Sequence, residues 1–326
     1  MHSLKRAPST SMLTESDTTH RSVCVLSPGK EDEQQKNQDR IALKAVQEQD
    51  GSYLQFAVVC DGITTSPYAA EAAEYVVEQV ESLLHREGLK QVVDHLQNLR
   101  EKLISKPIEL GDQYGSEVLK NIFADIIHEK YQRSYQTTFI SVCLAQRDQE
   151  VSVTAAGCGD SALFIFKENG ELLYNNINVA TAGDPFEHNS PFTAVLPDSF
   201  DETRTNVLLE NEQYGPDVQL LLCSDGFYDA FKNFGEIYEW LHAHQQELTM
   251  AHDVNGPLLE ELHTRLNQTK GDDDISFIWL LPRHNWSSDD VVVQPEVSVP
   301  TRCEAQNGLI GRLHQCLLSF GRPGKR

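Results

Sequence analysis

Apolar residues along this chain gather in short runs separated by polar turns, and this pattern predicts strands near both ends of the chain with helices between them. Short runs that are continuously apolar or alternate with polar residues are typical of strands. We expect strands at residues 22–26, 41–46, 53–60, 137–145, 150–156, 162–166, 171–174, 206–209, 218–223 and 275–281. The segment between residues 175 and 205 has no such pattern, and we expect an irregular connection there.

Other segments carry apolar residues at helical spacing. We expect helices at residues 67–84, 90–104, 115–131, 235–247 and 257–268. Ser66 followed by Pro67 favours a helix start, because Ser caps helix N-termini and Pro is tolerated at the first helical position. Strands and helices that occur in separate groups indicate the α+β class rather than alternating βαβ units.

Four aspartates stand beside the apolar runs: Asp61 in FAVVCDG, Asp160 in AAGCGDS, Asp225 in LLLCSDGFYD and Asp273 in GDDDISFIWLL. A carboxylate at the end of a buried strand is unfavourable unless its charge is compensated. Several carboxylates at one place repel each other, and a divalent cation removes that repulsion. A single Asp-Gly is also common in ordinary turns, so it is the repetition that predicts a metal site made of oxygen ligands.

These aspartates come from both early and late strands. They can meet most easily if two sheets pack face to face, which predicts a β-sandwich with helices outside it.

Composition and charge narrow the function classes. The chain has 326 residues, 40% of them apolar, and a net charge of -22, which disfavours nucleic-acid binding. No apolar run reaches the roughly 20 residues that span a bilayer, and the first residues lack a secretory signal pattern. Seven cysteines without a CxxC pair are typical of reduced core residues. We therefore expect a soluble, cytoplasmic protein.

Both termini differ from the segment between them. Residues 1–21 are polar and aperiodic, so we expect them to be disordered. Residues 283–326 form a linker and a basic tail, in which apolar residues from Leu309 to Phe320 fall on one helical face. This tail predicts docking to a partner or a membrane surface. A packed or frayed tail is the alternative, because Gly308 and Gly311 weaken a helix.

Six short motifs occur in an order and at a spacing that resemble a known family. They are NQDR (37–40), VVCDG (58–62), QTT (136–138), GCGDS (157–161), CSDGFYD (223–229) and DDIS (273–276). Together they resemble the metal-dependent Ser/Thr protein phosphatases of type 2C, in their compact single-domain form. The resemblance implies a catalytic domain over residues 22–282. It also implies a central antiparallel β-sandwich flanked by helical layers, in a four-layer α/β/β/α order.

The resemblance also implies a set of metal ligands. Asp61 matches the carboxylate that bridges two metal ions, and the Gly62 carbonyl matches a ligand of one of them. Asp225 and Asp273 match the later carboxylate ligands. Further matching positions are the supporting acidic residue Asp39, the third-metal ligand Asp160 and the outer acidic residue Asp229.

The implied chemistry is hydrolysis of phosphoserine or phosphothreonine in a phosphorylated protein substrate. Two Mg²⁺ or Mn²⁺ ions that share a water lower its pKa, and the resulting hydroxide attacks phosphorus in line. Hard cations of this kind prefer oxygen ligands and keep several waters. No phosphoenzyme and no protein nucleophile are needed.

Several positions depart from the family pattern. Gln38 stands where a Glu is usual, Asp274 replaces an Asn, and Gln136 replaces a Gly. Residues 63–65 contain no His that could act as a general acid. The usual phosphate-binding Arg is missing, and Lys36 is the candidate in its place, although a Lys cannot replace a bidentate Arg fully.

These departures leave a second function open. A catalytically weak relative that works as a binding or scaffold module is the alternative to an active phosphatase. The segment 176–205, which contains Pro185, His188, Pro191 and Phe192, is a candidate for substrate selection, and a solvated connection is its alternative.

Overall fold

The computed structural model of the chain describes residues 20–27, 37–47, 53–108, 117–147, 150–186, 195–198, 206–250, 256–269 and 273–282. The candidate phosphate ligand Lys36 and the proposed docking tail lie outside these residues, so both stay predictions. Within the described ranges, no helix is long and apolar enough to cross a membrane.

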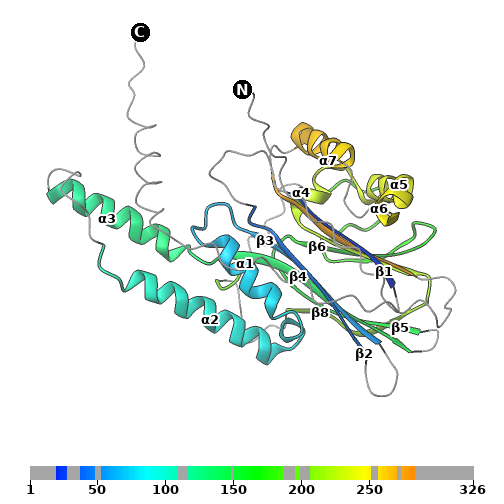
Figure 1. Cartoon of the computed structure of the whole chain (residues 1–326), viewed down its shortest axis with the longest axis horizontal. Coiled ribbons are helices and arrows are strands. Elements are labelled where there is room, and N and C mark those ends of the chain that lie inside the picture. Colours follow the sequence, from blue (N-terminus) through cyan, green and yellow to red (C-terminus); the bar gives the residue numbers. More distant parts are fainter. Residues whose placement is uncertain are drawn as a thin grey trace, which may run out of the picture. The chain divides into compact units, whose positions relative to one another are not determined.

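In the part of the chain that the structure describes, ten strands form two antiparallel five-stranded sheets (Figure 1). The first sheet contains, in spatial order, β1 (His20–Ser27), β10 (Ile275–Pro282), β9 (Val218–Cys223), β6 (Ala162–Lys167) and β7 (Leu172–Asn175). The second sheet contains β2 (Arg40–Gln47), β3 (Tyr53–Gly62), β4 (Thr137–Arg147), β5 (Glu150–Cys158) and β8 (Val207–Tyr214). All ten predicted strands are present, and β8 continues five residues beyond its predicted end because it pairs with β5 up to Tyr214.

The central strands are buried on both faces, which explains why their sequences are continuously apolar. In β9, Leu220 and Leu222 join a cluster of side chains from both sheets, whereas Leu221 and Cys223 point into a second cluster with helices. This follows from the two-residue period of a strand, in which neighbouring side chains point to opposite faces.

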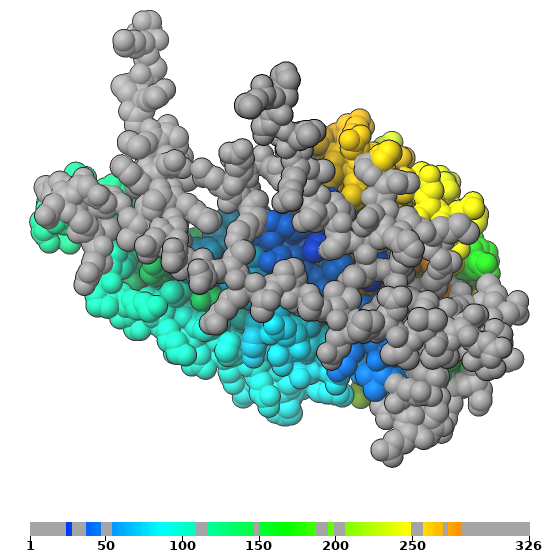
Figure 2. Space-filling view, viewed as in Figure 1, coloured from blue at the N-terminus to red at the C-terminus, as the bar shows by residue number. Residues whose placement is uncertain are grey.

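The described residues include seven helices beside the sheets, and Figure 1 shows them in two groups. They are α1 (Ala69–Glu78), α2 (Arg86–Ile104), α3 (Glu117–Gln132), α4 (Asp225–Tyr228), α5 (Phe234–Ala243), α6 (Gln245–Met250) and α7 (Gly256–Thr269). Buried residues of α1 and α2 share a cluster with β3 and β4, and those of α4, α5 and α7 share one with β6, β9 and β10. In Figure 2, α2 and α3 occupy one side of the visible surface, and the yellow and orange helices occupy the other. The α+β class with two antiparallel sheets is confirmed.

Two helix predictions need correction. The helix expected at residues 67–84 begins at Ala69 and ends at Glu78, and residues 82–84 form a separate 3-10 turn. The apolar spacing continues past the break because Leu83 and Leu84 are buried in the same cluster as α1. The helix expected at residues 235–247 is divided into α5 and α6 at His244, whose ring bonds to the Trp240 carbonyl oxygen at 2.9 Å.

The predicted cap at Ser66 is also wrong. The residue that precedes α1 is Tyr68, and its side chain makes no capping hydrogen bond. The Ser66 hydroxyl oxygen instead accepts a hydrogen bond from the backbone N–H of Gln136 at 3.1 Å. This bond ties the start of α1 to the chain just before β4.

Gly226, the second residue of α4, provides a test of how tightly α4 meets β10. A Cβ atom at this position would lie 2.0 Å from the carbonyl oxygen of Asp274. We expect Gly226→Ala to lower the stability by at least about 2 kcal/mol, since backbone must move to relieve the overlap. The thermal midpoint, followed by circular dichroism, should fall by roughly 5 °C.

The control for this test is Gly183→Ala, because no atom lies within 4 Å of a Cβ built at Gly183. This variant should melt within about 1 °C of the wild type. Equal midpoints for the two variants would contradict the close approach of α4 to β10.

Candidate metal centre

The predicted acidic residues lie at strand ends that the sheet register brings together. In the second sheet Arg40 is paired with Cys60 in antiparallel register. Asp39 precedes Arg40 and Asp61 follows Cys60, so the two aspartates come next in this register, at the same end of the sheet. In the first sheet Cys223 is paired with both Ala162 and Phe277. Asp160, Asp225 and Asp273 are each within four residues of this paired set, so they lie at one end of the first sheet.

Electrostatic interactions join the two groups of carboxylates. The pKa of Asp61 is raised well above its usual value, first by loss of hydration and then by four negative charges. Those charges belong to Asp39, Asp225, Asp273 and Asp160, in decreasing order of effect. Acidic residues from both sheets therefore act on the same carboxyl group.

Asp39 is the most deeply buried of these residues, with 1% of its surface exposed. Burial raises its pKa to about 8, and the negative charges of Asp274 and Asp273 add to this effect. Its Oδ2 atom has no hydrogen-bond partner among the residues that the structure describes. A buried carboxylate oxygen of this kind is unfavourable unless a cation or a proton neutralises it.

Two glycines allow the backbone segments to approach closely. A Cβ at Gly62 would lie 2.7 Å from the Cβ of Gln38, and one at Gly226 would lie 3.4 Å from the Cβ of Asp273. The end of β3 at Gly62 therefore lies against Gln38, which precedes β2. In the same way, Gly226 of α4 lies against the residues that precede β10. Side chains at these positions would hold the acidic segments apart.

Asp274 has a role that the sequence did not reveal. One of its carboxylate oxygens accepts a hydrogen bond from the backbone N–H of Gln38 at 2.7 Å. The loop before β2 is fixed further by Arg40, which donates to the carbonyl oxygens of Asn37 and Asp39 at 3.0 and 2.7 Å. Asp274 therefore links the loop that carries Asp39 to β10. The acidic run at residues 272–274 was the only signal for it in the sequence.

Hydroxyl groups support the end of β3. The hydroxyl of Thr137, a fully buried residue, donates to the carbonyl oxygen of Asp61 at 2.7 Å. The hydroxyls of Thr138 and Ser161 lie 2.7 Å apart. The QTT and GCGDS motifs contain these three residues, but only the contacts reveal that they brace the segments carrying Asp61 and Asp160.

Asp229, predicted as an outer acidic residue, is fully buried one residue after α4. Its backbone N–H donates to the carbonyl oxygen of Asp225 at 2.8 Å. Its own carbonyl oxygen accepts a hydrogen bond from the Thr269 hydroxyl at 2.6 Å, which ties α4 to the end of α7.

The donor chemistry of this region fits a hard divalent cation. All the side chains involved offer carboxylate oxygens, which Mg²⁺ and Mn²⁺ prefer, and Asp39 contributes an unpaired buried oxygen atom. Across the described ranges, no three His, Cys, Asp or Glu side chains are arranged as ligands of a single ion. The residue types therefore suit such a cation, and the assignment of each ligand stays a prediction.

Two described parts of the segment 176–205 bond to chain segments close to the predicted site residues. Phe186 donates its backbone N–H to the Lys232 carbonyl oxygen at 2.9 Å, just after α4. Leu196 exchanges two backbone hydrogen bonds with Thr137, the residue that supports Asp61. His188, Pro191 and Phe192 lie outside the described residues, so their part in substrate selection stays a prediction.

Solved structures of phosphatases match this chain at low sequence identity. PppA of Pseudomonas aeruginosa is 18% identical, with a TM-score of 0.43, and the match covers 82% of this chain and 99% of PppA. A serine/threonine phosphatase from Staphylococcus aureus is 16% identical, with a TM-score of 0.39, over 86% of this chain and all of that protein. A serine/threonine phosphatase from S. agalactiae is 14% identical, with a TM-score of 0.40, over 81% and 100%. Comparison with curated protein sequences finds no match.

A match to a protein-family model shows the family to which this chain belongs. The model described as Protein phosphatase 2C matches residues 28–267, which is well over half of the chain. The matched segment includes Asp39, Asp61, Asp160 and Asp225, and it ends just before Asp273. The strand order, the acidic strand ends and this match lead to one conclusion: the chain belongs to the protein phosphatase 2C family.

Proposed function

We propose that this protein is a metal-dependent phosphatase that hydrolyses phosphoserine and phosphothreonine in proteins. The observation that carries the proposal is the effect of four other aspartates on the pKa of Asp61, in a chain of the protein phosphatase 2C family. Carboxylates that destabilise one another in this way are favoured where they bind cations. The cytoplasm, where free cysteines persist, is the proposed location, and the five described cysteines are free.

We assign two Mg²⁺ or Mn²⁺ ions to this cluster, with Asp61, Asp225, Asp273 and the Gly62 carbonyl as ligands. Asp39 supports one ion, and Asp160 is the proposed ligand of a third. When bound, such ions lower the pKa of water and neutralise the charge that develops on a phosphoryl group. No phosphoenzyme and no protein nucleophile enter the proposed reaction.

The residues around the ligands have separate roles. Thr137 fixes the backbone at Asp61, and Asp274 fixes the loop that carries Asp39. These contacts would keep the ligands in place when a substrate binds. The entropy cost of positioning the ligands would then be smaller during the reaction. Lys36 is the proposed contact for the substrate phosphate.

A catalytically weak binding module is the second candidate function. It is favoured by the absence of the family's phosphate-binding Arg, since a bidentate Arg binds phosphate with more fixed geometry than a Lys. Binding of metal without turnover would distinguish this module from an active phosphatase. Under either reading, the basic tail at residues 301–326 remains a candidate docking segment.

The first prediction concerns the two aspartates assigned to the metals from different sheets. With Mn²⁺ present, Asp61→Asn and Asp225→Asn should each lower the turnover of a phosphothreonine peptide at least about 100-fold, because each removes a charged ligand. Release of inorganic phosphate measures this. A chelator should abolish the wild-type activity.

Asp94→Asn is the matched control, because Asp94 is an exposed aspartate on α2. It should keep the wild-type rate. If wild-type protein binds Mn²⁺ by calorimetry but releases no phosphate, the binding module replaces the phosphatase. If Asp61→Asn keeps full turnover, the metal assignment is wrong.

The second prediction concerns the stability of the metal-free protein. The pKa of Asp39 rises from about 3.9 in the unfolded chain to about 8 in the folded chain, because of burial and the charges of Asp274 and Asp273. The folded state therefore holds a proton that the unfolded state has lost. Stability falls as the pH rises from about 4 to about 8.

Asp39→Asn removes this loss of stability, since an amide does not ionise. In the presence of a chelator, the variant should melt several degrees Celsius above the wild type at pH 8 and close to it near pH 4. Its affinity for Mn²⁺ should fall at the same time. A chelated variant that is no more stable than the wild type at pH 8 would show that Asp39 is not under charge repulsion.

A further inference from the structure

Two tyrosines stack at the edge of the candidate metal centre. The ring centroids of Tyr68 and Tyr135 lie 4.9 Å apart, with 15° between the ring planes. Both residues are half-buried, so part of the pair meets solvent. Tyr135 has a φ of 59°, a left-handed conformation that is rare for a bulky residue. Strained conformations of this kind occur preferentially at functional sites.

Short contacts connect this tyrosine pair to Asp61. Gln136, the residue after Tyr135, donates to the Ser66 hydroxyl at 3.1 Å and accepts from the Ile63 N–H at 3.3 Å. The next residue, Thr137, donates to the Asp61 carbonyl oxygen at 2.7 Å. Each residue of an extended chain spans about 3.3 Å, so Tyr135 lies about 10 Å from Asp61 along this path. A bound peptide would cover that distance in about three residues.

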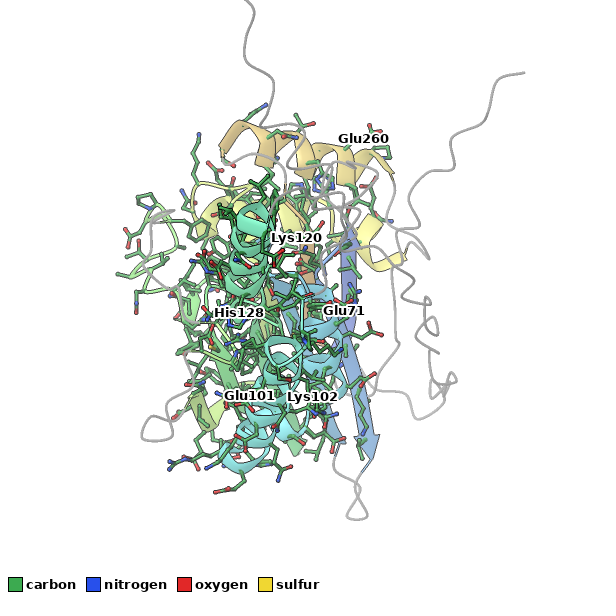
Figure 3. The ribbon with its side chains drawn as sticks, turned by 90° about the vertical axis from the view of Figure 1, so that its left-hand side faces the viewer. Glu71, Glu101, Lys102, Lys120, His128 and Glu260 are labelled. Carbon is green, nitrogen blue, oxygen red and sulfur yellow. The ribbon has the colours of Figure 1, made fainter. Side chains whose placement is uncertain are left out.

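A negative charge accompanies the pair. Glu71, in the first turn of α1, is exposed and makes no ion pair with any described residue. Burial and a neighbouring tyrosine raise the pKa of Tyr68 and that of Tyr135, the latter to about 12, and Glu71 adds to both shifts. Figure 3 shows Glu71 on the side of the molecule that carries Lys120 and His128 of α3.

Two basic side chains close to Tyr135 in the chain or in space already have acidic partners. Arg100, which donates to the Ser134 carbonyl oxygen at 3.0 Å, is paired with Asp198. Arg133 forms an ion pair with Glu129 at 3.5 Å. The charge of Glu71 therefore remains to act on a ligand beside the two rings.

We propose that Tyr68, Tyr135 and Glu71 form a subsite for a basic side chain of the phosphoprotein substrate, about three residues from the phosphorylated Ser or Thr. This inference rests on the proposed function. A Lys or Arg cation is attracted to the face of a tyrosine ring and to a carboxylate, so the three residues favour the same ligand group. The net charge of -22 favours the approach of basic segments as well.

The test uses pairs of peptides that carry a phosphonate analogue of phosphothreonine, which resists hydrolysis. In the first pair, the residue three positions before the analogue is either Arg or Ala. In the second pair, the residue three positions after the analogue is either Arg or Ala. Fluorescence anisotropy in the presence of Mn²⁺ gives their affinities for full-length protein. One of the two Arg peptides should bind the wild type about fivefold more tightly than its Ala partner.

Glu71→Gln and Tyr68→Leu should each reduce this preference to about twofold or less. Glu78→Gln, a matched change at an exposed position of α1, should leave it intact. Thermal midpoints equal to that of the wild type would show that the variants are folded. Hydrolysis of p-nitrophenyl phosphate, a substrate too small to reach the subsite, should be equal in all four proteins.

Two results would overturn the subsite. One is an absence of Arg preference in the wild type, and the other is an equal loss of preference in Glu78→Gln and Glu71→Gln, which would indicate only the general charge of the surface. The proposed phosphatase function is judged separately, by whether the wild type hydrolyses p-nitrophenyl phosphate at all. A preference for Arg peptides without this hydrolysis would support the subsite and contradict the activity.

Discussion

Mutual repulsion between carboxylates is an unfavourable interaction that the rest of this structure must offset. Asp39, Asp225, Asp273 and Asp160 all make ionisation of Asp61 less favourable, and they reach it from two different sheets. A folded chain holds such groups together only if many other contacts stabilise the arrangement. In this protein those contacts are the three apolar clusters and the hydrogen bonds that fix each acidic segment to its neighbour.

Several of the hydrogen bonds that fix the acidic segments are made to backbone groups rather than to acidic side chains. Thr137 bonds the carbonyl oxygen of Asp61, Thr269 bonds that of Asp229, and Arg40 bonds those of Asn37 and Asp39. In these contacts the acidic residues are held through their backbone. Acidic side chains take part elsewhere, since the Asp274 carboxylate accepts a bond from the Gln38 N–H and the Asp273 carboxylate accepts one from the Asp274 N–H.

The strands could be predicted from sequence because both of their faces are buried. Residues such as Leu220, Leu221 and Leu222 have no polar neighbour in the strand, and a continuous apolar run beside an aspartate is a strong local signal. The candidate ligands could be identified for the same reason, since each follows or precedes such a run. The ligand assignments themselves came from the resemblance to a family.

Several of the errors and omissions involve partners that are distant in sequence. Ser66 looks like a helix cap locally, but its hydroxyl bonds a backbone group 70 residues later. The end of α1 at Glu78 is hidden because the 3-10 turn that follows buries Leu83 and Leu84 as a longer helix would. The pairs Thr138–Ser161 and Gln38–Asp274 become neighbours only when the sheets form. Local patterns carry no information about such contacts.

The two-sided burial of β10 also bears on how accurately the acidic cluster is assembled. In this strand Phe277 and Trp279 face the helices, whereas Ile278 and Leu280 face the other sheet. A slip of one residue against β9 would exchange these two sets and would displace Asp273 by about 3.3 Å. The burial of Phe277 and Trp279 on one face of β10, and of Ile278 and Leu280 on the other, therefore fixes the position of Asp273 along the strand. When β10 pairs with β9 in the observed register, Asp273 is already at its place beside the other aspartates.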